Sequence, residues 1–292
     1  MPHFAAGVLL YSAAALALDA APRALRAGLI DHATATALMR SATVRFESDG
    51  WAEDAARSLR DEGFCVVRAG GAQISDRILE SCRGVASARL SDLLARVGRR
   101  GVDLWPAASE PFRYLELVHR EGTGRYDMPL PWCVDGQTGD VSLPAAAETA
   151  FGELHSAMDG VARPIVGALW AEQAVSDEMR AGCVISEPGA LAQPSHRDGP
   201  DGLVTVFAPL TAFVPRNGPT ELSPSTHRGG DDSSSLAPLL QPGDVLLFDY
   251  RCLHRGLANE GNSRREVAYA VYARDGVRDV QNFPSATTLE FD

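Results

Sequence analysis

The sequence predicts an α+β domain in which helices come first and support a β-barrel. Three stretches before residue 171 carry apolar side chains at helical spacing, whereas from residue 182 onward short apolar runs are separated by turns rich in Gly, Pro and Asn. Helices followed by strands are typical of this class. With 292 residues, of which 45% are hydrophobic, the chain can bury one substantial core, so we expect a single enlarged domain.

The first helix is expected over residues 51–60. Ser48 and Asp49 are available to cap its N-terminus, and Gly63 is placed to end it. A strand is expected at residues 64–67, because four apolar residues follow that glycine directly.

The second helix should begin at a Ser75 cap and run to about residue 97, with an apolar stripe formed by Ile78, Leu79, Cys82, Val85, Leu90, Leu93 and Leu94. A third helical region covers residues 145–170 and should be bent or split at Pro164, because proline lacks the backbone N–H. Between these two helices, residues 101–139 are rich in Gly, Pro and aromatic residues and are expected to be irregular.

The strongest functional signal comes from His196, Asp198 and His254. The first two form a His-x-Asp pair, and the second histidine follows about 56 residues later. Two imidazoles and one carboxylate can occupy one face of an octahedral metal and leave three positions open, as in non-haem Fe(II) oxygenases. A His-x-Asp pair alone is a weak signal, since a chain of this length can contain one by chance.

Arg265 strengthens that signal. It lies about 11 residues beyond His254, where an apolar strand over residues 267–272 begins, and its planar guanidinium can bind a carboxylate through two parallel hydrogen bonds. The far carboxylate of 2-oxoglutarate is the expected ligand. A turn at residues 241–244 and a buried strand at 245–250 lie between the metal-binding segments. These segments follow one another in the order that a jelly-roll barrel requires: a metal-binding residue, a turn, a strand, a second metal-binding residue, and a strand with the carboxylate-binding arginine.

Six short segments carry a family resemblance: ISEPGA at residues 185–190, QPSHRD at 193–198, VFAPL at 206–210, NGPT at 217–220, SPSTHR at 223–228 and FDYRCLHRGLAN at 248–259. The stretch from residue 183 to residue 274, about a third of the chain, resembles the phytanoyl-CoA dioxygenase family of Fe(II)- and 2-oxoglutarate-dependent oxygenases. Residues 61–67 are more loosely similar to the family's entry strand. One departure is the short connection after Asp198, where many members carry a longer loop.

The resemblance implies a double-stranded β-helix (jelly-roll, cupin-like) core with flanking N-terminal helices. It also implies that the His196, Asp198 and His254 side chains hold Fe(II), and that 2-oxoglutarate and O₂ take the open positions. The family register selects Arg265 rather than its neighbour Arg264 as the carboxylate clamp, since alternation turns only one of them inward.

Thr205 and Phe207 share one face of their strand. If that face lines the barrel, the threonine can hydrogen-bond 2-oxoglutarate and the phenylalanine can wall it off; plain core packing is the alternative.

The implied reaction is oxidation of an unactivated C–H bond of a small molecule, with release of succinate and CO₂. The carboxylate of Asp198 favours hydroxylation, desaturation or ring closure over halogenation, because halogenases of this superfamily have a small residue there. Two alternatives stay open. A non-catalytic jelly-roll binding module would not turn over 2-oxoglutarate, and a Zn²⁺-dependent hydrolase would give Arg265 no role and need no O₂.

Other candidate residues are assigned structural roles. His227 is expected to hydrogen-bond backbone in its turn rather than bind metal, and Arg197 and Arg255 are expected to point away from the metal by strand alternation. The cysteines are scattered and odd in number, so we expect small buried hydrophobes rather than disulfides: Cys65, Cys82, Cys133, Cys183 and Cys252. Residues 105–132 are a candidate substrate lid, in which Arg125 and Asp127 could contact a polar substrate; a solvated loop is the alternative.

The charge excludes several classes of partner. A net charge of −11 argues against nucleic acid or an anionic membrane surface, and the small-molecule substrate is the expected partner. Every basic residue is Arg, which removes Schiff-base lysine chemistry and Walker-type phosphate binding. The sequence does not indicate an oligomeric state.

The N-terminus has two interpretations. Residues 4–18 form an apolar run that is too short for a comfortable membrane span but typical of a signal-peptide core, and arginines dominate the charges up to residue 45. Residues 1–45 are therefore a cleavable leader or an N-terminal helix packed on the domain, which places the protein in an organelle or in the cytoplasm. Residues 46–292 form the expected dioxygenase domain.

Overall fold

The computed structural model describes residues 24–26, 32–69, 73–108, 110–119, 123–130, 145–171, 173–176, 180–230, 232 and 234–279. The helices are α1 (His32–Ser41), α2 (Trp51–Glu62), α4 (Asp76–Arg99) and α5 (Ala145–Trp170), with a 3-10 turn η1 (Thr226–Arg228). The strands are β1 (Ala24–Arg26), β2 (Thr43–Arg45), β3 (Phe64–Arg68), β4 (Phe112–Tyr114), β5 (Leu117–His119), β6 (Arg125–Pro129), β7 (Arg180–Ser186), β8 (Leu203–Pro209), β9 (Thr220–Leu222), β10 (Leu236–Pro238), β11 (Asp244–Asp249), β12 (His254–Gly256) and β13 (Arg265–Ala273).

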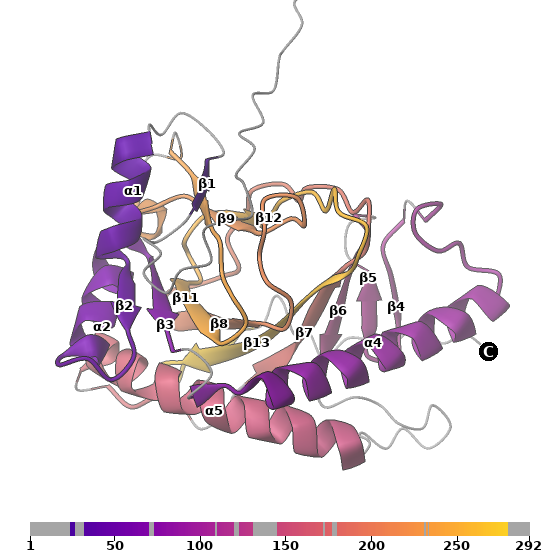
Figure 1. Cartoon of the computed structure of the whole chain (residues 1–292), viewed down its shortest axis with the longest axis horizontal. Coiled ribbons are helices and arrows are strands. Elements are labelled where there is room, and N and C mark those ends of the chain that lie inside the picture. Colours follow the sequence, from indigo (N-terminus) through magenta and orange to yellow (C-terminus); the bar gives the residue numbers. More distant parts are fainter. Residues whose placement is uncertain are drawn as a thin grey trace, which may run out of the picture.

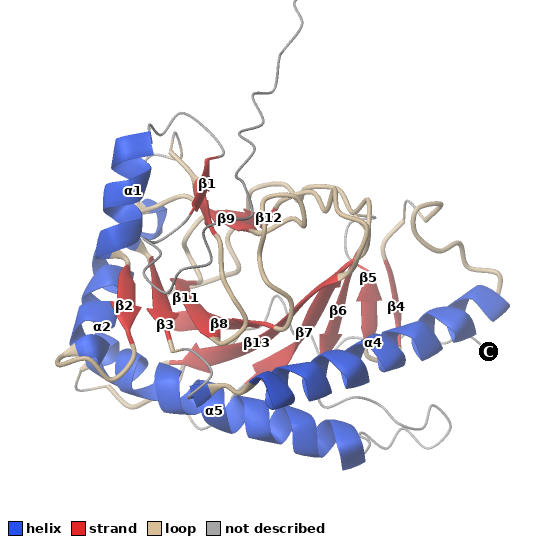
Figure 2. Ribbon diagram, in the orientation of Figure 1, coloured by secondary structure: helices blue, strands red, loops and turns tan. Residues whose placement is uncertain are grey.

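The strands form a large and a small sheet, with the small one above the large one in Figure 2. The large sheet has the order β2-β3-β11-β8-β13-β7-β6-β5-β4, and the small sheet has the order β1-β10-β9-β12. Strands β8 and β9 are consecutive in the chain yet belong to different sheets, and so are β11 and β12. The chain therefore crosses repeatedly between the two sheets, which confirms the predicted jelly-roll core.

Helices α4 and α5 run along the outer side of the large sheet, and α1 and α2 stand at one end of it (Figure 1). Strand β13 shows how alternation divides the two sides. Ala268, Ala270 and Tyr272 belong to the core that contains the buried faces of α2, α4 and α5. The Tyr272 hydroxyl donates a hydrogen bond to Asp159 of α5, at 3.0 Å. Burial of each large apolar side chain in this layer contributes about 1.5–3 kcal/mol.

Helix α2 ends as predicted but begins differently. Gly63 adopts φ 84°, and its N–H donates back to the last turn of the helix. The predicted caps Ser48 and Asp49 are wrong, because Gly50 is the N-cap residue with φ 70° and no side-chain cap forms. The Ser48 hydroxyl instead donates to the Arg45 carbonyl, at 2.8 Å, which closes the turn before the helix.

Helices α4 and α5 test the other two helix predictions. The Ser75 hydroxyl accepts a hydrogen bond from the Ile78 N–H, so the predicted cap is confirmed, and the predicted apolar stripe lies in or against the main core. Pro164 does not split α5, which is assigned as one helix from residue 145 to residue 170. Val161 and Ile165 are fully buried on either side of the proline, and this packing holds the helix together.

We predicted that residues 101–139 would be irregular, and this prediction is wrong for part of the region. Its described part contains β4, β5 and β6, which extend the large sheet beyond β7. These strands have three to five residues, too few to show a clear alternation. Phe112, Tyr114 and Tyr126 are buried in the main core. Where the candidate lid forms these three strands, it is part of the large sheet. Trp132 lies outside the described residues.

Part of the N-terminal segment packs on the barrel. Strand β1 pairs with β10, and β2 pairs in parallel with β3. Met39 of α1 is fully buried in a core cluster with Leu236 and Leu246. The apolar run at residues 4–18 lies outside the described residues, so the leader stays a prediction.

The cysteine prediction is confirmed where the structure describes it. Cys65, Cys82, Cys183 and Cys252 are buried free thiols, and Cys133 lies outside the described residues. Burial raises the pKa of the Cys252 thiol to about 12, so it stays protonated as a packing residue. In the part of the chain that the structure describes, no helix has the length and apolar character needed to cross a membrane.

The buried His155 of α5 generates a pH prediction. Burial lowers its pKa to about 4, whereas an unfolded histidine titrates near 6.5. As the pH falls from 6.5 to 4, the unfolded chain binds a proton that the folded chain does not, which lowers stability by roughly 3 kcal/mol. We expect His155→Gln to lose less stability than the wild type between pH 7 and pH 4 in urea unfolding. Equal losses would show that this histidine does not govern acid stability.

Candidate active site

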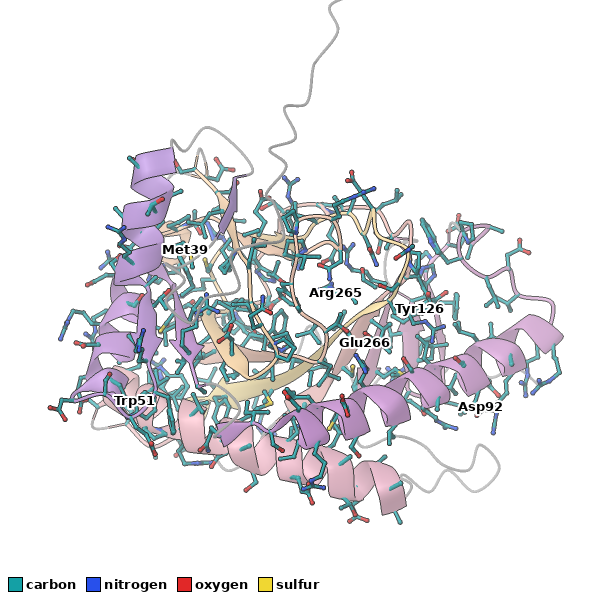
Figure 3. All side chains as sticks on the ribbon, in the orientation of Figure 1. Met39, Trp51, Asp92, Tyr126, Arg265 and Glu266 are labelled. Atoms are coloured by element: carbon teal, nitrogen blue, oxygen red, sulfur yellow. The ribbon has the colours of Figure 1, made fainter. Side chains whose placement is uncertain are left out.

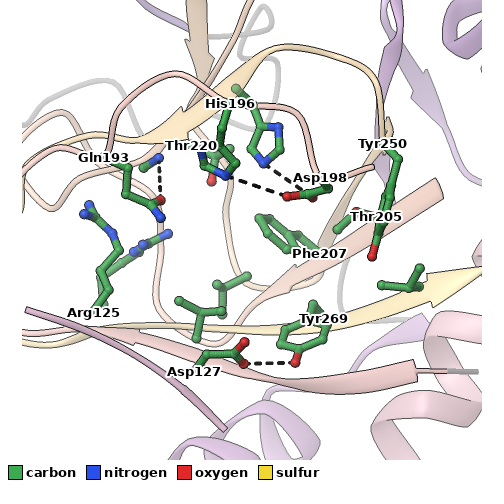
Figure 4. A pocket seen from close by; sticks show the side chains of 16 residues that line it. Arg125, Asp127, Gln193, His196, Asp198, Thr205, Phe207, Thr220, Tyr250 and Tyr269 are labelled. Carbon is green, nitrogen blue, oxygen red and sulfur yellow. Dashed lines mark hydrogen bonds and ion pairs between the residues drawn. The ribbon is translucent and has the colours of Figure 1, made fainter. Parts of the chain in front are cut away.

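His196, Asp198 and His254 come together at one end of the barrel interior. The backbones of His196 and His254 form a reciprocal bridge, each N–H donating to the other carbonyl at 3.0 Å. The Asp198 N–H donates to the Tyr250 carbonyl, at 2.9 Å. One potential ligand atom from each of the three side chains lies within 4.8 Å of the others. The sequence-predicted triad is therefore brought into metal-binding proximity, and Figure 4 shows His196 beside Asp198.

Hydrogen bonds orient both imidazoles. Nδ1 of His196 lies 2.9 Å from the Pro194 carbonyl, and Nδ1 of His254 lies 3.0 Å from the Cys252 carbonyl. A proton on each Nδ1 leaves the Nε2 lone pair directed at Asp198, whose oxygens lie 3.7 and 3.5 Å from the two Nε2 atoms. Burial lowers the pKa of His254, although Asp198 opposes this, and the neutral imidazole is the form that binds metal. The donor set fits a divalent iron with open positions.

The triad opens onto a cavity between the two sheets. Its described lining combines polar groups with an apolar surface: Arg125, Asp127, Val184, Gln193, His196, Asp198, Thr205, Phe207, Thr220, Tyr250, His254, Gly256, Arg265, Val267, Tyr269 and Val271. Strand β13 contributes every second residue from 265 to 271, as alternation requires.

Arg265 lies inside the molecule, where its label falls between the sheets in Figure 3. It is 2% exposed, and its guanidinium lies 5.1 Å from the Phe213 ring centroid. Its Nε is buried and has no hydrogen-bond partner among the residues that the structure describes. Burial lowers the pKa of this guanidinium to about 10, so it remains a cation at neutral pH. Arg264 points elsewhere and pairs with Glu187, which confirms the choice of Arg265 as the inward residue.

Thr205 and Phe207 share one face of β8, as predicted, and the structure shows that this face lines the cavity. The Thr205 hydroxyl is buried and has no hydrogen-bond partner among the described residues, so it is available to a ligand. Phe207 packs edge-on against Phe248, at 5.2 Å between ring centroids. The sequence analysis missed Ser186, which lies opposite Arg265 in the β7–β13 register. Its hydroxyl is also buried without a hydrogen-bond partner among the described residues. A strand-pairing register would have been needed to find it.

The residues assigned structural roles lie outside the cavity. Nε2 of His227 lies 3.1 Å from the Arg60 carbonyl, which holds η1 against α2. Arg197 donates to the Arg251 and Thr226 carbonyls, and Arg255 pairs with Glu221. These interactions confirm that His227 bonds backbone and that neither arginine points at the metal-binding atoms.

Arg125 and Asp127, for which substrate contact and a solvated loop were both open, line the cavity from β6. Arg125 donates hydrogen bonds to the Leu191 and Leu257 carbonyls. A Cβ at residue 256 would lie 2.7 Å from the Arg125 Nε, so this arrangement requires Gly256. The sequence analysis did not identify Gln193 or Tyr269; alternation from Arg265 along β13 was a usable signal for Tyr269.

The fold and the three convergent ligands are those of jelly-roll oxygenases that use non-haem iron. A family comparison agrees, since residues 59–267 match the sequence model of the phytanoyl-CoA dioxygenase (PhyH) family. The match spans more than half of the chain, and the chain therefore belongs to the phytanoyl-CoA dioxygenase family, a family of 2-oxoglutarate-dependent non-haem iron dioxygenases.

Curated relatives are fungal dioxygenases. The dioxygenase FrzG of a Cladobotryum species is 31% identical over 98 residues, which are 25% of this chain and 32% of that protein. The dioxygenase aneA of Aspergillus aculeatus is 34% identical over 30% of this chain and 37% of its own. The multifunctional dioxygenase ausE of Emericella nidulans is 30% identical over 34% of this chain and 42% of its own. The chain thus spans less than half the length of these relatives.

Solved structures share the fold. AviO1 from Streptomyces viridochromogenes superposes with a TM-score of 0.51 at 18% identity, covering 77% of this chain and 95% of AviO1. The non-haem α-ketoglutarate-dependent epimerase SnoN, from nogalamycin biosynthesis, has a TM-score of 0.50 at 15% identity, covering 82% of this chain and 90% of its own.

The buried Nε of Arg265, unpaired among the described residues, predicts where 2-oxoglutarate is held. We expect Arg265→Met to weaken 2-oxoglutarate binding by at least about 30-fold, the effect of losing one side of a buried charge pair. Calorimetry with anaerobic, Fe(II)-loaded protein measures this affinity, and Arg264→Met is the matched control because its side chain points out of the cavity. Iron binding should be unchanged in both variants. Unchanged 2-oxoglutarate affinity in Arg265→Met would remove the arginine from the site.

Proposed function

We propose that the protein is an Fe(II)- and 2-oxoglutarate-dependent dioxygenase that hydroxylates a C–H bond of a small organic molecule. The observation that carries the proposal is the buried Nε of Arg265, which has no hydrogen-bond partner in the described part of the chain and lies in the cavity onto which His196, Asp198 and His254 converge. A hydrolase needs the metal ligands but not a buried cation beside them. A co-substrate with two carboxylates, one for the metal and one for the arginine, uses both.

The stoichiometry of the proposed reaction is balanced. One substrate C–H bond, one O₂ and one 2-oxoglutarate give one C–OH group, one CO₂ and one succinate, so the oxo acid supplies the two electrons that the substrate does not. Bound Fe(II) supplies the redox chemistry that activates O₂.

The chain's own residues orient the reactants and exclude water. The two imidazoles and Asp198 would occupy one face of the metal and leave the cavity side to ligands. Arg265 would bind the distal carboxylate of 2-oxoglutarate and fix its direction. Phe207 and Val267 present apolar surface beside these groups, and a dry surrounding strengthens the charge interactions within it. The carboxylate of Asp198 occupies a ligand position, which favours hydroxylation or a related oxidation over halogenation.

Removal of Asp198 tests the proposal. With Fe(II), O₂ and no substrate added, we expect the wild type to convert 2-oxoglutarate slowly to succinate, and Asp198→Ala to lose at least 99% of this rate because one of three ligands is missing. NMR detection of succinate measures both rates. Asp201→Ala, three residues along the same loop and outside the cavity lining, is the matched control.

Two results would contradict the proposal. Full turnover in Asp198→Ala would show that the triad does not hold the metal. A wild-type protein that binds the metal but turns over no 2-oxoglutarate would return the binding module and the hydrolase as the better accounts.

A further inference from the structure

We propose that the substrate is uncharged, has an apolar body, and presents a hydroxyl group to the Asp127 carboxylate. Tyr269 orients this carboxylate on the cavity wall through a hydrogen bond. This inference rests on the proposed function and adds the class of substrate that the site accepts.

Asp127 and Tyr269 form a buried pair on the cavity wall. The Tyr269 hydroxyl donates to Oδ1 of Asp127 at 2.9 Å, and the two residues are 4% and 7% exposed, the tyrosine being the less exposed. In Figure 4 the pair lies on the opposite side of the pocket from His196 and Asp198, with Phe207 drawn between them. A substrate group bound here would lie across the cavity from the metal ligands.

The pair spans three strands, and the middle strand makes room for it. Tyr269 is on β13, Asp127 is on β6, and β7 lies between them. Residue 182 of β7 is the register partner of Tyr269, and a Cβ at this position would lie 2.6 Å from the Tyr269 Cζ. The ring reaches the carboxylate only because Gly182 has no side chain. The hydrogen bond from Tyr269 thus fixes the direction of the Asp127 carboxylate, and the close approach of the ring to Gly182 fixes the tyrosine.

The charges around the cavity favour a neutral substrate. Among the described lining residues the fixed charges are those of Arg125, Arg265, Asp127 and Asp198, so two cations face two anions. Fe(II) and the 2-oxoglutarate dianion cancel each other in the same way. A substrate with a net charge would therefore enter the cavity without a counter-charge, which is unfavourable.

Hydrogen-bonding chemistry narrows the class further. A carboxylate accepts hydrogen bonds and donates none, so Asp127 selects a donor. Arg125 lies two residues away on the same face of β6 and offsets the charge of Asp127, which favours a hydroxyl over an ammonium. Val184, Val267 and Val271 provide apolar surface for the rest of the molecule.

Three probes with one ring and one variable group test this charge selectivity. They are trans-cyclohexane-1,4-diol, trans-4-aminocyclohexanol and trans-4-hydroxycyclohexanecarboxylate, titrated by calorimetry into anaerobic protein saturated with Fe(II) and 2-oxoglutarate. We expect the diol to bind at least tenfold more tightly than the amine or the acid. Tighter or equal binding of either ion, or no measurable binding of the diol, would overturn the proposal.

Two variants and two matched controls locate the effect. Tyr269→Phe should weaken diol binding about fivefold, and Asp127→Asn should shift the preference toward the acid at least tenfold, since it leaves the cavity with an excess positive charge. Tyr272→Phe and Asp159→Asn remove the same kind of pair from the outer face of β13 and should change neither value. Equal effects in both sets would overturn the proposal.

The titration of Fe(II) and 2-oxoglutarate into each protein is recorded first. If the wild type does not bind Fe(II) and 2-oxoglutarate, this counts against the proposed function. If it binds both but does not prefer the diol over the charged probes, this counts against the substrate class alone.

Discussion

The register of β13 is the constraint on which both the core and the cavity depend. The strand lies between β7 and β8 and pairs with each of them over seven residues. In this register Arg265 and Tyr269 face the cavity, while Ala268 and Ala270 face the helices. A slip by one residue would exchange the two sets, burying the arginine among α4 and α5 and placing Glu266 beside the metal ligands. The same pairing that stabilises the sheet therefore sets the charge of the active site.

The site holds two buried polar groups that have no hydrogen-bond partner among the residues that the structure describes. The unpaired Nε of Arg265 and the unpaired hydroxyl of Thr205 each lower stability by about 1–3 kcal/mol. The surrounding sheet compensates, because it buries apolar residues on both of its faces. A co-substrate with a carboxylate would satisfy these groups on binding. The groups that lower the folding stability of the protein would therefore raise its affinity for the co-substrate. The reciprocal backbone bridge between His196 and His254 needs no ligand and keeps the metal-binding atoms together beforehand.

Much of this site could be predicted because it depends on local patterns. Residue spacing indicates the His-x-Asp pair, the later histidine and the arginine at a strand start. Alternation turns only one of Arg264 and Arg265 inward, and it was the family register that selected Arg265. Alternation placed Thr205 and Phe207 on one face of their strand, and the structure shows that this face lines the cavity. The pairing register of strands that lie far apart in the chain could not be inferred from the sequence. Ser186 reaches Arg265 only through the β7–β13 register, and Gly182 matters only because the Tyr269 ring crosses it. The short strands β4 to β6 carried too few residues for any periodicity, and the N-cap of α2 depended on the φ of Gly50.

The most direct test of the central claim is the anaerobic addition of Fe(II) and then 2-oxoglutarate to the purified protein, recorded by visible absorption. Chelation of iron by the oxo acid produces a metal-to-ligand charge-transfer band. The account predicts this band in the wild type and its absence in His196→Ala. Iron binding by the wild type with no band on addition of 2-oxoglutarate would show that the oxo acid does not chelate the metal, and it would contradict the account.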